Sequence, residues 1–325
     1  MTARPAPQAG RLLMSLYPVR YRALHGEDIA AVFARTAEGL PRRAVLRERF
    51  DLAAHALRLR LRIGPTDPAG RVLAGAAPVT LAIAAGRCLF FLLSRLHERV
   101  HRIRYPFPGS GLGHAVLDAV LLVAGTLPWL LALALAAVGR WRAARITGLL
   151  AALVEVGIQE LEGIYQLWLV GYLLGLLLVG ALLLLAPPDL VDVTKRGRWE
   201  AAGLALGVGL PLIAADRYQL TRHLSLNMAT VGLFPLWLCA ATAVVLLLRL
   251  SGRRPDGLRA AGVALAVLPW LVHLVFAAVD DPARELRRIV RYGGACLVLL
   301  GLAAALAAAV HLVRRTWWDK PTDPA

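Results

Sequence analysis

Hydrophobic residues follow two different patterns along this chain, one before and one after a linker at residues 64–68. Before the linker, apolar residues recur at helical spacing among polar ones and form two stripes. These stripes are Tyr21, Leu24, Ile29, Val32 and Phe33, then Leu46, Phe50, Ala53, Leu57 and Leu61. Two or three short amphipathic helices that pack on each other would bury both stripes. After the linker, apolar residues run in long blocks. The pattern predicts an all-α protein: a small helical domain followed by a polytopic helical membrane bundle.

About eight blocks are predicted to span a membrane, because each could close its backbone hydrogen bonds within one helix across the hydrocarbon core. The predicted spans are 72–94, 113–138, 146–161, 164–186, 199–215, 229–248, 260–278 and 290–313. The third and fifth are short, and losing either would move the carboxyl terminus to the other side. Residues 1–70 form the predicted amino-terminal domain, with helix breaks at Pro18 and at Gly39-Leu40-Pro41, and residues 71–325 form the bundle.

Charge orients the predicted bundle. The 325 residues carry a formal net charge of +16, and residues 1–70 contain twelve Arg against six Asp and Glu. Short loops rich in Arg and Lys favour the cytoplasmic side, so both termini are predicted to be cytoplasmic. Two outer loops, 95–112 and 279–289, also carry several Arg, and the first has an apolar stripe that suits an interfacial helix.

Composition excludes several classes of function. With 58% hydrophobic residues and a mean hydropathy of +0.61, the chain suits a lipid bilayer. Basic residues beside apolar blocks, with few aromatics in residues 1–70, indicate contact with anionic lipid and no nucleic-acid partner. Cys88, Cys239 and Cys296 fall inside predicted spans and are expected to pack as small apolar residues. No phosphate-binding loop, nucleotide signature or Cys-x-x-Cys pair occurs, so no cofactor is predicted.

Six polar residues inside the predicted spans are candidates for a ligand-binding cluster. They are Arg87, His114, Asp118, Glu155, Gln159 and His273. In the predicted topology each lies in the outer half of its helix, and ionisable groups in lipid are expected to face one another or a wet cavity. Arg87 is predicted to pair with Asp118 or with Glu155. The alternative is that such a pair only holds the bundle together, with no ligand.

A second constellation is His97-Glu98-Arg99-Val100-His101, which reads H-E-x-x-H. On a helix His97 and His101 would share one face and could bind Zn²⁺, while Glu98 would serve as general base. Neighbouring arginines would repel a cation, and no third ligand has a recognisable context. The alternative is a solvated basic helix end in which Glu98 pairs with Arg102.

Prolines are expected to bend five of the predicted spans. They are Pro78, Pro128, Pro211, Pro235 and Pro269. The string Leu127-Pro128-Trp129-Leu130 recurs as Leu268-Pro269-Trp270-Leu271. Such strings arise easily in this composition, and the two spans are predicted to run in opposite directions, so the recurrence is only weak evidence for an internal duplication.

The first sixty residues resemble the permease-prefix type of amino-terminal module. The resemblance rests on the segment from Leu16 to Arg22, on His25-Gly26-Glu27-Asp28, on Val32-Phe33, and on Arg47-Glu48 with Asp51-Leu52. It implies a cytoplasmic docking or regulatory module. In better-known relatives the prefix precedes an exporter-like permease with a large outer domain, and this chain has no outer loop long enough for one. The rest is similar to uncharacterised multi-pass plasma-membrane proteins of high-GC bacteria.

Three functions are compatible with the sequence. The first is a non-enzymatic regulatory or sensory membrane protein, with a polar cavity open to the outer side and a cytoplasmic protein partner bound through residues 1–62. The second is a transporter or permease component, favoured by the proline-containing spans and the polar cluster. The third is a membrane zinc peptidase that uses the H-E-x-x-H motif. The pattern does not define an oligomeric state.

Overall fold

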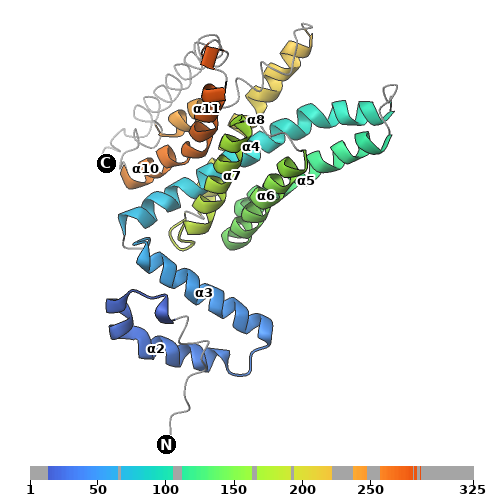
Figure 1. Ribbon diagram of the computed structural model, residues 1–325. Helices are drawn as coiled ribbons and strands as arrows, with labels where there is room; N and C mark the ends of the chain where they lie inside the picture. The colour runs from blue at the N-terminus through green and yellow to red at the C-terminus, as the bar shows by residue number, and fades with distance from the viewer. Residues whose placement is uncertain are drawn as a thin grey trace, which may run out of the picture. The chain divides into compact units, whose positions relative to one another are not determined.

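The computed structural model describes residues 14–64, 67–104, 112–162, 167–191, 194–221, 237–246 and 257–280, together with residues 282, 283 and 286. Within these ranges every regular element is a helix and none is a strand (Figure 1). The chain divides into two compact units, Met1–Arg71 and Val72–Ala325. The predicted all-helical fold is confirmed. The predicted span 290–313, half of 229–248, and the 279–289 loop apart from residues 279, 280, 282, 283 and 286 lie outside the described residues.

The amino-terminal unit contains α2 (Val19–Ala37) and α3 (Arg42–Arg60). Each helix begins directly after a proline, Pro18 or Pro41, because proline has no amide hydrogen and suits a helix start. Between them the chain turns at Gly39, whose φ of +78° is a conformation that glycine adopts without steric cost. The helix breaks predicted at Pro18 and at Gly39-Leu40-Pro41 are confirmed.

Tyr17 forms the centre of this unit and is only 1% exposed. Its hydroxyl lies 3.1 Å from Nδ1 of His55 and donates to the carbonyl of Leu52 at 3.4 Å, while its ring stacks on Tyr21 with centroids 5.7 Å apart. Burial raises the pKa of the Tyr17 hydroxyl, and burial together with the charge of Arg58 lowers the pKa of His55. A hydrogen-bonded aromatic contact therefore joins the start of the unit to α3.

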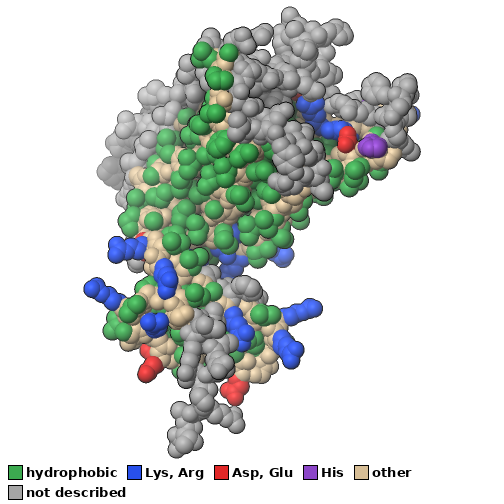
Figure 2. Space-filling view, in the orientation of Figure 1, with side chains coloured by type: hydrophobic (Ala, Val, Ile, Leu, Met, Phe, Trp, Pro, Cys, Tyr) green, Lys and Arg blue, Asp and Glu red, His purple; other side chains and the backbone are tan. Residues whose placement is uncertain are grey.

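The two apolar stripes of this unit do not pack on each other as predicted. Leu24 is 76% exposed and Val32 55%, while Leu46, Leu57 and Leu61 are each about half exposed. The reason is that α3 turns the side carrying Leu52 and the buried Ala56 toward Tyr17, which points the leucine stripe outward. Figure 2 shows hydrophobic and basic side chains next to each other on this unit.

The second unit begins with the long helix α4 (Pro68–Arg104). It continues with α5 (Leu112–Ala137), α6 (Trp141–Glu162), α7 (Leu167–Leu185), α8 (Lys195–Thr221), a helix over Trp237–Leu246, α10 (Gly257–Leu265) and α11 (Leu268–Asp280). Among the described residues, three segments are long and apolar enough to cross a membrane, namely Pro68–His101, Gly113–Ala137 and Gly257–Phe276. The predicted spans 146–161 and 199–215 coincide with α6 and α8, which are helices but are not among these three.

Helix α4 is the central helix of the unit, because its neighbours bury 72% of its most apolar stretch, against 17% for α5. Small residues allow this close packing. A Cβ added to Gly86 would meet Val208 Cβ at 2.8 Å on α8, and one added to Gly75 would meet the Arg259 carbonyl oxygen at 2.8 Å on α10. Helix α5, in contrast, leaves several of its leucines and valines exposed.

One predicted boundary is wrong. Helix α4 continues to Arg104, so residues 95–104 are part of the first helix rather than a loop or a separate interfacial helix. The predicted span 260–278 matches the segment Gly257–Phe276, which is able to cross a membrane. Its helix is interrupted at residues 266–267, just before Pro269, and so forms α10 and α11. Proline favours such an interruption, because it has no amide hydrogen and its ring clashes with the carbonyl four residues earlier. Pro78, Pro128 and Pro211 lie inside the unbroken helices α4, α5 and α8.

Basic residues predicted to face the cytoplasm gather at one end of the bundle. At the start of α8, Arg198 donates from Nη1 to the Ala137 carbonyl that ends α5, at 3.3 Å. On the first turns of α6, Arg145 donates to the Ala186 carbonyl just after α7, at 3.4 Å. Cations are favourable at helix C-termini, where carbonyls lack intrahelical partners. The ends of α5 and α7 therefore lie beside the starts of α8 and α6.

Candidate functional site

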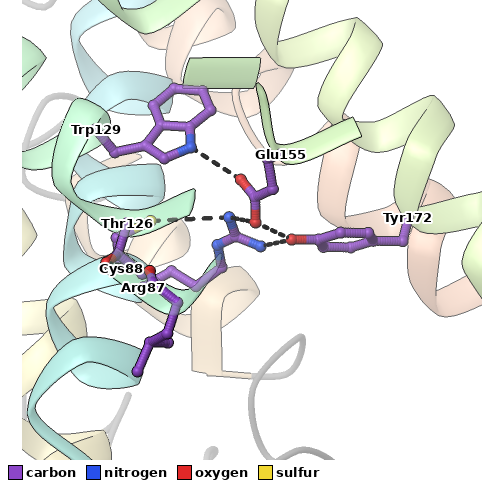
Figure 3. A network of polar contacts seen from close by, with 7 residues as sticks. Arg87, Cys88, Thr126, Trp129, Glu155 and Tyr172 are labelled. Carbon is purple, nitrogen blue, oxygen red and sulfur yellow. Dashed lines mark hydrogen bonds and ion pairs between the residues drawn. The ribbon is translucent and has the colours of Figure 1, made fainter. Parts of the chain in front are cut away.

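Four helices of the second unit bring polar side chains together in its interior. Figure 3 shows Arg87 from α4, Trp129 from α5, Glu155 from α6 and Tyr172 from α7 converging on one point. The Arg87 side chain is 2% exposed and that of Glu155 12%. Buried charges are costly unless each has a partner, so the contacts of these two groups decide what the site can do.

Both carboxylate oxygens of Glu155 accept hydrogen bonds from neighbouring side chains. Arg87 forms an ion pair with Oε1 through Nη2, and the Tyr172 hydroxyl donates to the same oxygen. Trp129 donates from Nε1 to Oε2 at 2.8 Å. The Tyr172 hydroxyl also accepts from Nη1 of Arg87, which closes a ring of polar contacts.

Aromatic side chains enclose the guanidinium group. The Cζ atom of Arg87 lies 5.3 Å from the ring centroid of Tyr172, 5.8 Å from that of Trp270 and 5.9 Å from that of Phe91. Such rings attract a cation through their negative faces, most strongly where water is excluded. The Nε atom of Arg87 is buried and has no hydrogen-bond partner among the described residues.

This arrangement suits a structural and conformational role better than acid or base catalysis. Positive and negative charge cancel within the site, and both carboxylate oxygens already accept hydrogen bonds. One network therefore links α4, α5, α6 and α7, and Trp270 adds α11. A displacement of any of these helices must break a buried polar contact, which is unfavourable in a low-dielectric interior.

Four of the six predicted cluster residues, Arg87, Glu155, Gln159 and His273, lie at this site or beside it. Of the two partners predicted for Arg87, the structure selects Glu155. The ring of His273 on α11 packs edge-on against Tyr172, with centroids 5.6 Å apart. Gln159 lies one turn beyond Glu155 on α6 and is half-buried.

The other two residues lie elsewhere on α5. Asp118 takes Arg99 of α4 as its partner rather than Arg87, and these side chains are 45% and 29% exposed. His114, one turn before Asp118, is exposed. The predicted single cluster is thus replaced by a buried pair and a separate, half-exposed pair, because α4 extends beyond the predicted span and brings Arg99 to Asp118.

Trp129, Tyr172 and Trp270 complete the site although sequence reasoning did not select them. The recurring Leu-Pro-Trp-Leu strings supply both tryptophans: Trp129 donates to Glu155, and Trp270 lies over the Arg87 guanidinium. The recurrence could have identified them, since tryptophan in a span combines apolar surface with a donor that needs a partner. The only indication for Tyr172 was its polar hydroxyl in an otherwise apolar segment.

The H-E-x-x-H motif lies near the end of α4, on residues 97–101. The side chains of His97, Glu98 and Arg102 lie outside the described residues, and His101 is exposed. Within the part of the chain whose side chains are described, no three His, Cys, Asp or Glu residues gather as metal ligands. Zinc binding by His97 and His101 stays a prediction, as does the Glu98–Arg102 pair.

Compared with models of known protein families, with curated proteins and with solved structures, the chain shows no match.

Proposed function

We propose that this chain is a multi-pass protein of the bacterial plasma membrane with a regulatory or sensory, non-enzymatic role. In this proposal about eight helices span the membrane, and both termini are cytoplasmic. The bundle binds a lipid or envelope component from the outer side, and the amino-terminal unit passes its state to a cytoplasmic protein. Support comes from three segments able to cross a membrane and from the arginines that cap helix ends at one end of the bundle.

The observation that carries the proposal is the ring of contacts among Arg87, Glu155, Tyr172 and Trp129. It connects four helices, so an occupant that moves one of them would affect the packing of the others. The guanidinium Nε is buried with no hydrogen-bond partner in the described part of the chain, which gives a bound polar group one donor to engage. In this proposal, binding of a ligand changes the packing of the helices, and the ligand itself is not chemically altered.

The outward side of α2 supports a protein partner for the amino-terminal unit. Leu24 and Val32 are 76% and 55% exposed there, and helical spacing places Asp28 and Arg35 between and beside them. Exposed apolar side chains among charges of both signs are typical of a surface that binds another protein.

Two variants test both halves of the proposal. Cross-linking in intact cells should recover a protein with the wild-type chain, and Leu24→Asp with Val32→Asp should abolish that recovery while the chain stays in the membrane. Glu155→Gln should change the amount of partner protein that is cross-linked, although Glu155 lies in the bundle. The reason is that partner binding depends on how the helices of the bundle are packed. Equal recovery from the wild type and from Glu155→Gln would contradict the regulatory role.

A transporter component is the second candidate, favoured by prolines inside α4, α5 and α8 next to a buried polar network. Proline interrupts helical hydrogen bonding and gives a span a place to bend during alternating access. Proteoliposomes loaded with candidate lipids or small solutes distinguish the two functions, since a transporter gives flux that Arg87→Gln abolishes and a sensor gives none.

A further inference from the structure

The outward face of α3 combines leucine with arginine. Leu46 is 50% exposed, and Leu57 and Leu61 are each 47% exposed. At 100° per residue these three positions fall within one side of the helix, and the exposed residues Arg42, Arg43 and Arg60 fall on the same side. We refer to these six residues as the α3 face.

The α3 face carries no carboxylate. The two acidic residues of α3, Glu48 and Asp51, fall on other sides of the helix by spacing, and Glu48 is half-buried. Arg60 donates from Nη2 to the Ser15 carbonyl at 2.8 Å, which holds the end of the helix to the start of the unit. The α3 face is therefore positively charged and apolar at once, whereas the α2 surface around Leu24 carries charges of both signs.

A short closed turn connects α3 to the first membrane-spanning segment. The Gly64 amide donates to the Asp67 carboxylate at 2.8 Å, and the Asp67 amide donates to the Gly64 carbonyl at 3.1 Å. Gly70 lies so close to the Gly64 carbonyl that a Cβ there would collide with it. Pro68, where this segment begins, follows Arg60 by eight residues, which limits their separation to roughly 26–29 Å even for an extended chain.

We propose that the α3 face binds the surface of the surrounding bilayer through anionic lipid headgroups. The arginines pair with headgroup phosphates, and the leucines enter the boundary between headgroups and acyl chains, as in interfacial amphipathic helices. Because α3 cannot move far from the start of α4, the local concentration of lipid at this face is high without any separate targeting signal. The proposal rests on the membrane location and cytoplasmic orientation given above, but not on a protein partner.

Lipid contact can be measured on the full chain in nanodiscs. Leu57→Cys carries a fluorescent label in a background with Cys88→Ala, Cys239→Ala and Cys296→Ala, and Leu24→Cys on α2 is the matched control. Lipids bearing a quencher in the upper acyl chain report contact, in discs of phosphatidylcholine alone or mixed with phosphatidylglycerol. We expect quenching at position 57 to exceed that at position 24, to increase with phosphatidylglycerol and to fall at high salt.

A second variant separates charge from general proximity. Arg42→Gln with Arg43→Gln should reduce the partition of the labelled helix to the anionic surface roughly fivefold for each arginine, and should change little in phosphatidylcholine. Equal quenching at positions 24 and 57, or quenching insensitive to lipid charge, would overturn the proposal. The proposal would also be overturned if the label at position 57 became shielded from solvent only after cytosolic protein is added, because the α3 face would then bind a protein. Loss of a partner in Leu24→Asp with Val32→Asp tests the other surface, so the two proposals fail separately.

Discussion

Two ion pairs that involve α4 differ in burial and in the number of partners, according to where the arginine lies along the helix. Arg87 pairs with Glu155 where α4 is surrounded by other helices, and both side chains are almost completely buried. Arg99, three turns later, pairs with Asp118 where both side chains are substantially exposed. The first pair has added donors from Tyr172 and Trp129, whereas the second is a contact between two helices only.

The difference follows from packing. Around Arg87, glycine and alanine on α4 allow α8 to approach closely, and aromatic side chains fill the remaining space. Water is excluded there, so each charge depends on its partners. Near Arg99 both side chains remain accessible and can exchange a lost partner for solvent. Loss of the Arg87–Glu155 pair is therefore expected to lower the stability of the bundle strongly, and loss of the Arg99–Asp118 pair only slightly.

The largest effect is expected from Glu155→Ala. This variant leaves the buried Arg87 without its counter-ion and should destabilise the bundle by about 3–5 kcal/mol. Thermal unfolding of the purified protein in detergent measures the loss. Glu200→Gln, in the exposed pair that Arg196 and Glu200 form on α8, is the control and should change little. Equal melting temperatures for the two variants would refute the buried role of Glu155.

Trp129→Phe should have an intermediate effect. The ring is retained, but Oε2 of Glu155 loses the donor at 2.8 Å, which should cost about 1–3 kcal/mol because the oxygen is buried. The same substitution at Trp270 is the control, since phenylalanine there keeps an aromatic face for the guanidinium. A larger loss at Trp270 than at Trp129 would show that the ring contacts outweigh the hydrogen bond.

Gly86→Ala tests whether close packing keeps the buried pair dry. Its added methyl group would meet Val208 Cβ at 2.8 Å and should push α8 away from α4, at a cost of about 1–3 kcal/mol. Gly207→Ala on α8 is the matched control, since a Cβ there has nothing within 4 Å. That control should be neutral or slightly stabilising, because alanine favours a helix over glycine. Faster hydrogen exchange along α4 in Gly86→Ala alone would support the packing account.

Asp118→Asn should have a small effect, because the Arg99–Asp118 pair is half-exposed. The expected loss is about 0–1 kcal/mol, and it should shrink further as salt is added. Unfolding at low and high ionic strength measures both features. A loss as large as that of Glu155→Ala would remove the distinction between the two ends of α4.

The smallest effect concerns pH and the amino-terminal unit. Burial and the charge of Arg58 lower the pKa of His55 in the folded unit, so its contribution to stability is present above the unfolded pKa and is lost as pH falls toward the folded value. The side chain is largely exposed, which keeps the effect small. Protection factors for hydrogen exchange in α3, which correct for the slower intrinsic exchange at lower pH, should fall between roughly pH 7.5 and pH 5.5, and His55→Gln should remove that fall.

The hydrophobic pattern predicted the helical class and the helix breaks of the amino-terminal unit, because proline and glycine act locally. Long apolar blocks likewise predicted segments able to cross a membrane. The end of α4 was missed because hydropathy falls after residue 94 while the backbone hydrogen bonding continues to Arg104. Mean hydropathy falls where a helix becomes rich in charged residues, so hydropathy alone does not locate the end of the helix.

The candidate site was predictable only in part. Shared depth along the spans suggested Arg87 and Glu155 as partners, since unpaired charges in lipid are costly. Depth alone did not separate Asp118 from Glu155, because the choice depends on which faces of α5 and α6 turn toward α4. The stripes of α2 and α3 were misassigned for a similar reason: spacing defines a face, but the aromatic contact of Tyr17 decides which face is covered.

A double-mutant cycle on Arg87→Met and Glu155→Met tests the buried pair most directly. Each single variant leaves one uncompensated charge in the interior and should lower the melting temperature strongly, while the double variant removes both charges and should recover most of the loss. The coupling between the two positions is then large. Losses that simply add would contradict the account, because they would show that Arg87 and Glu155 do not depend on each other inside the bundle.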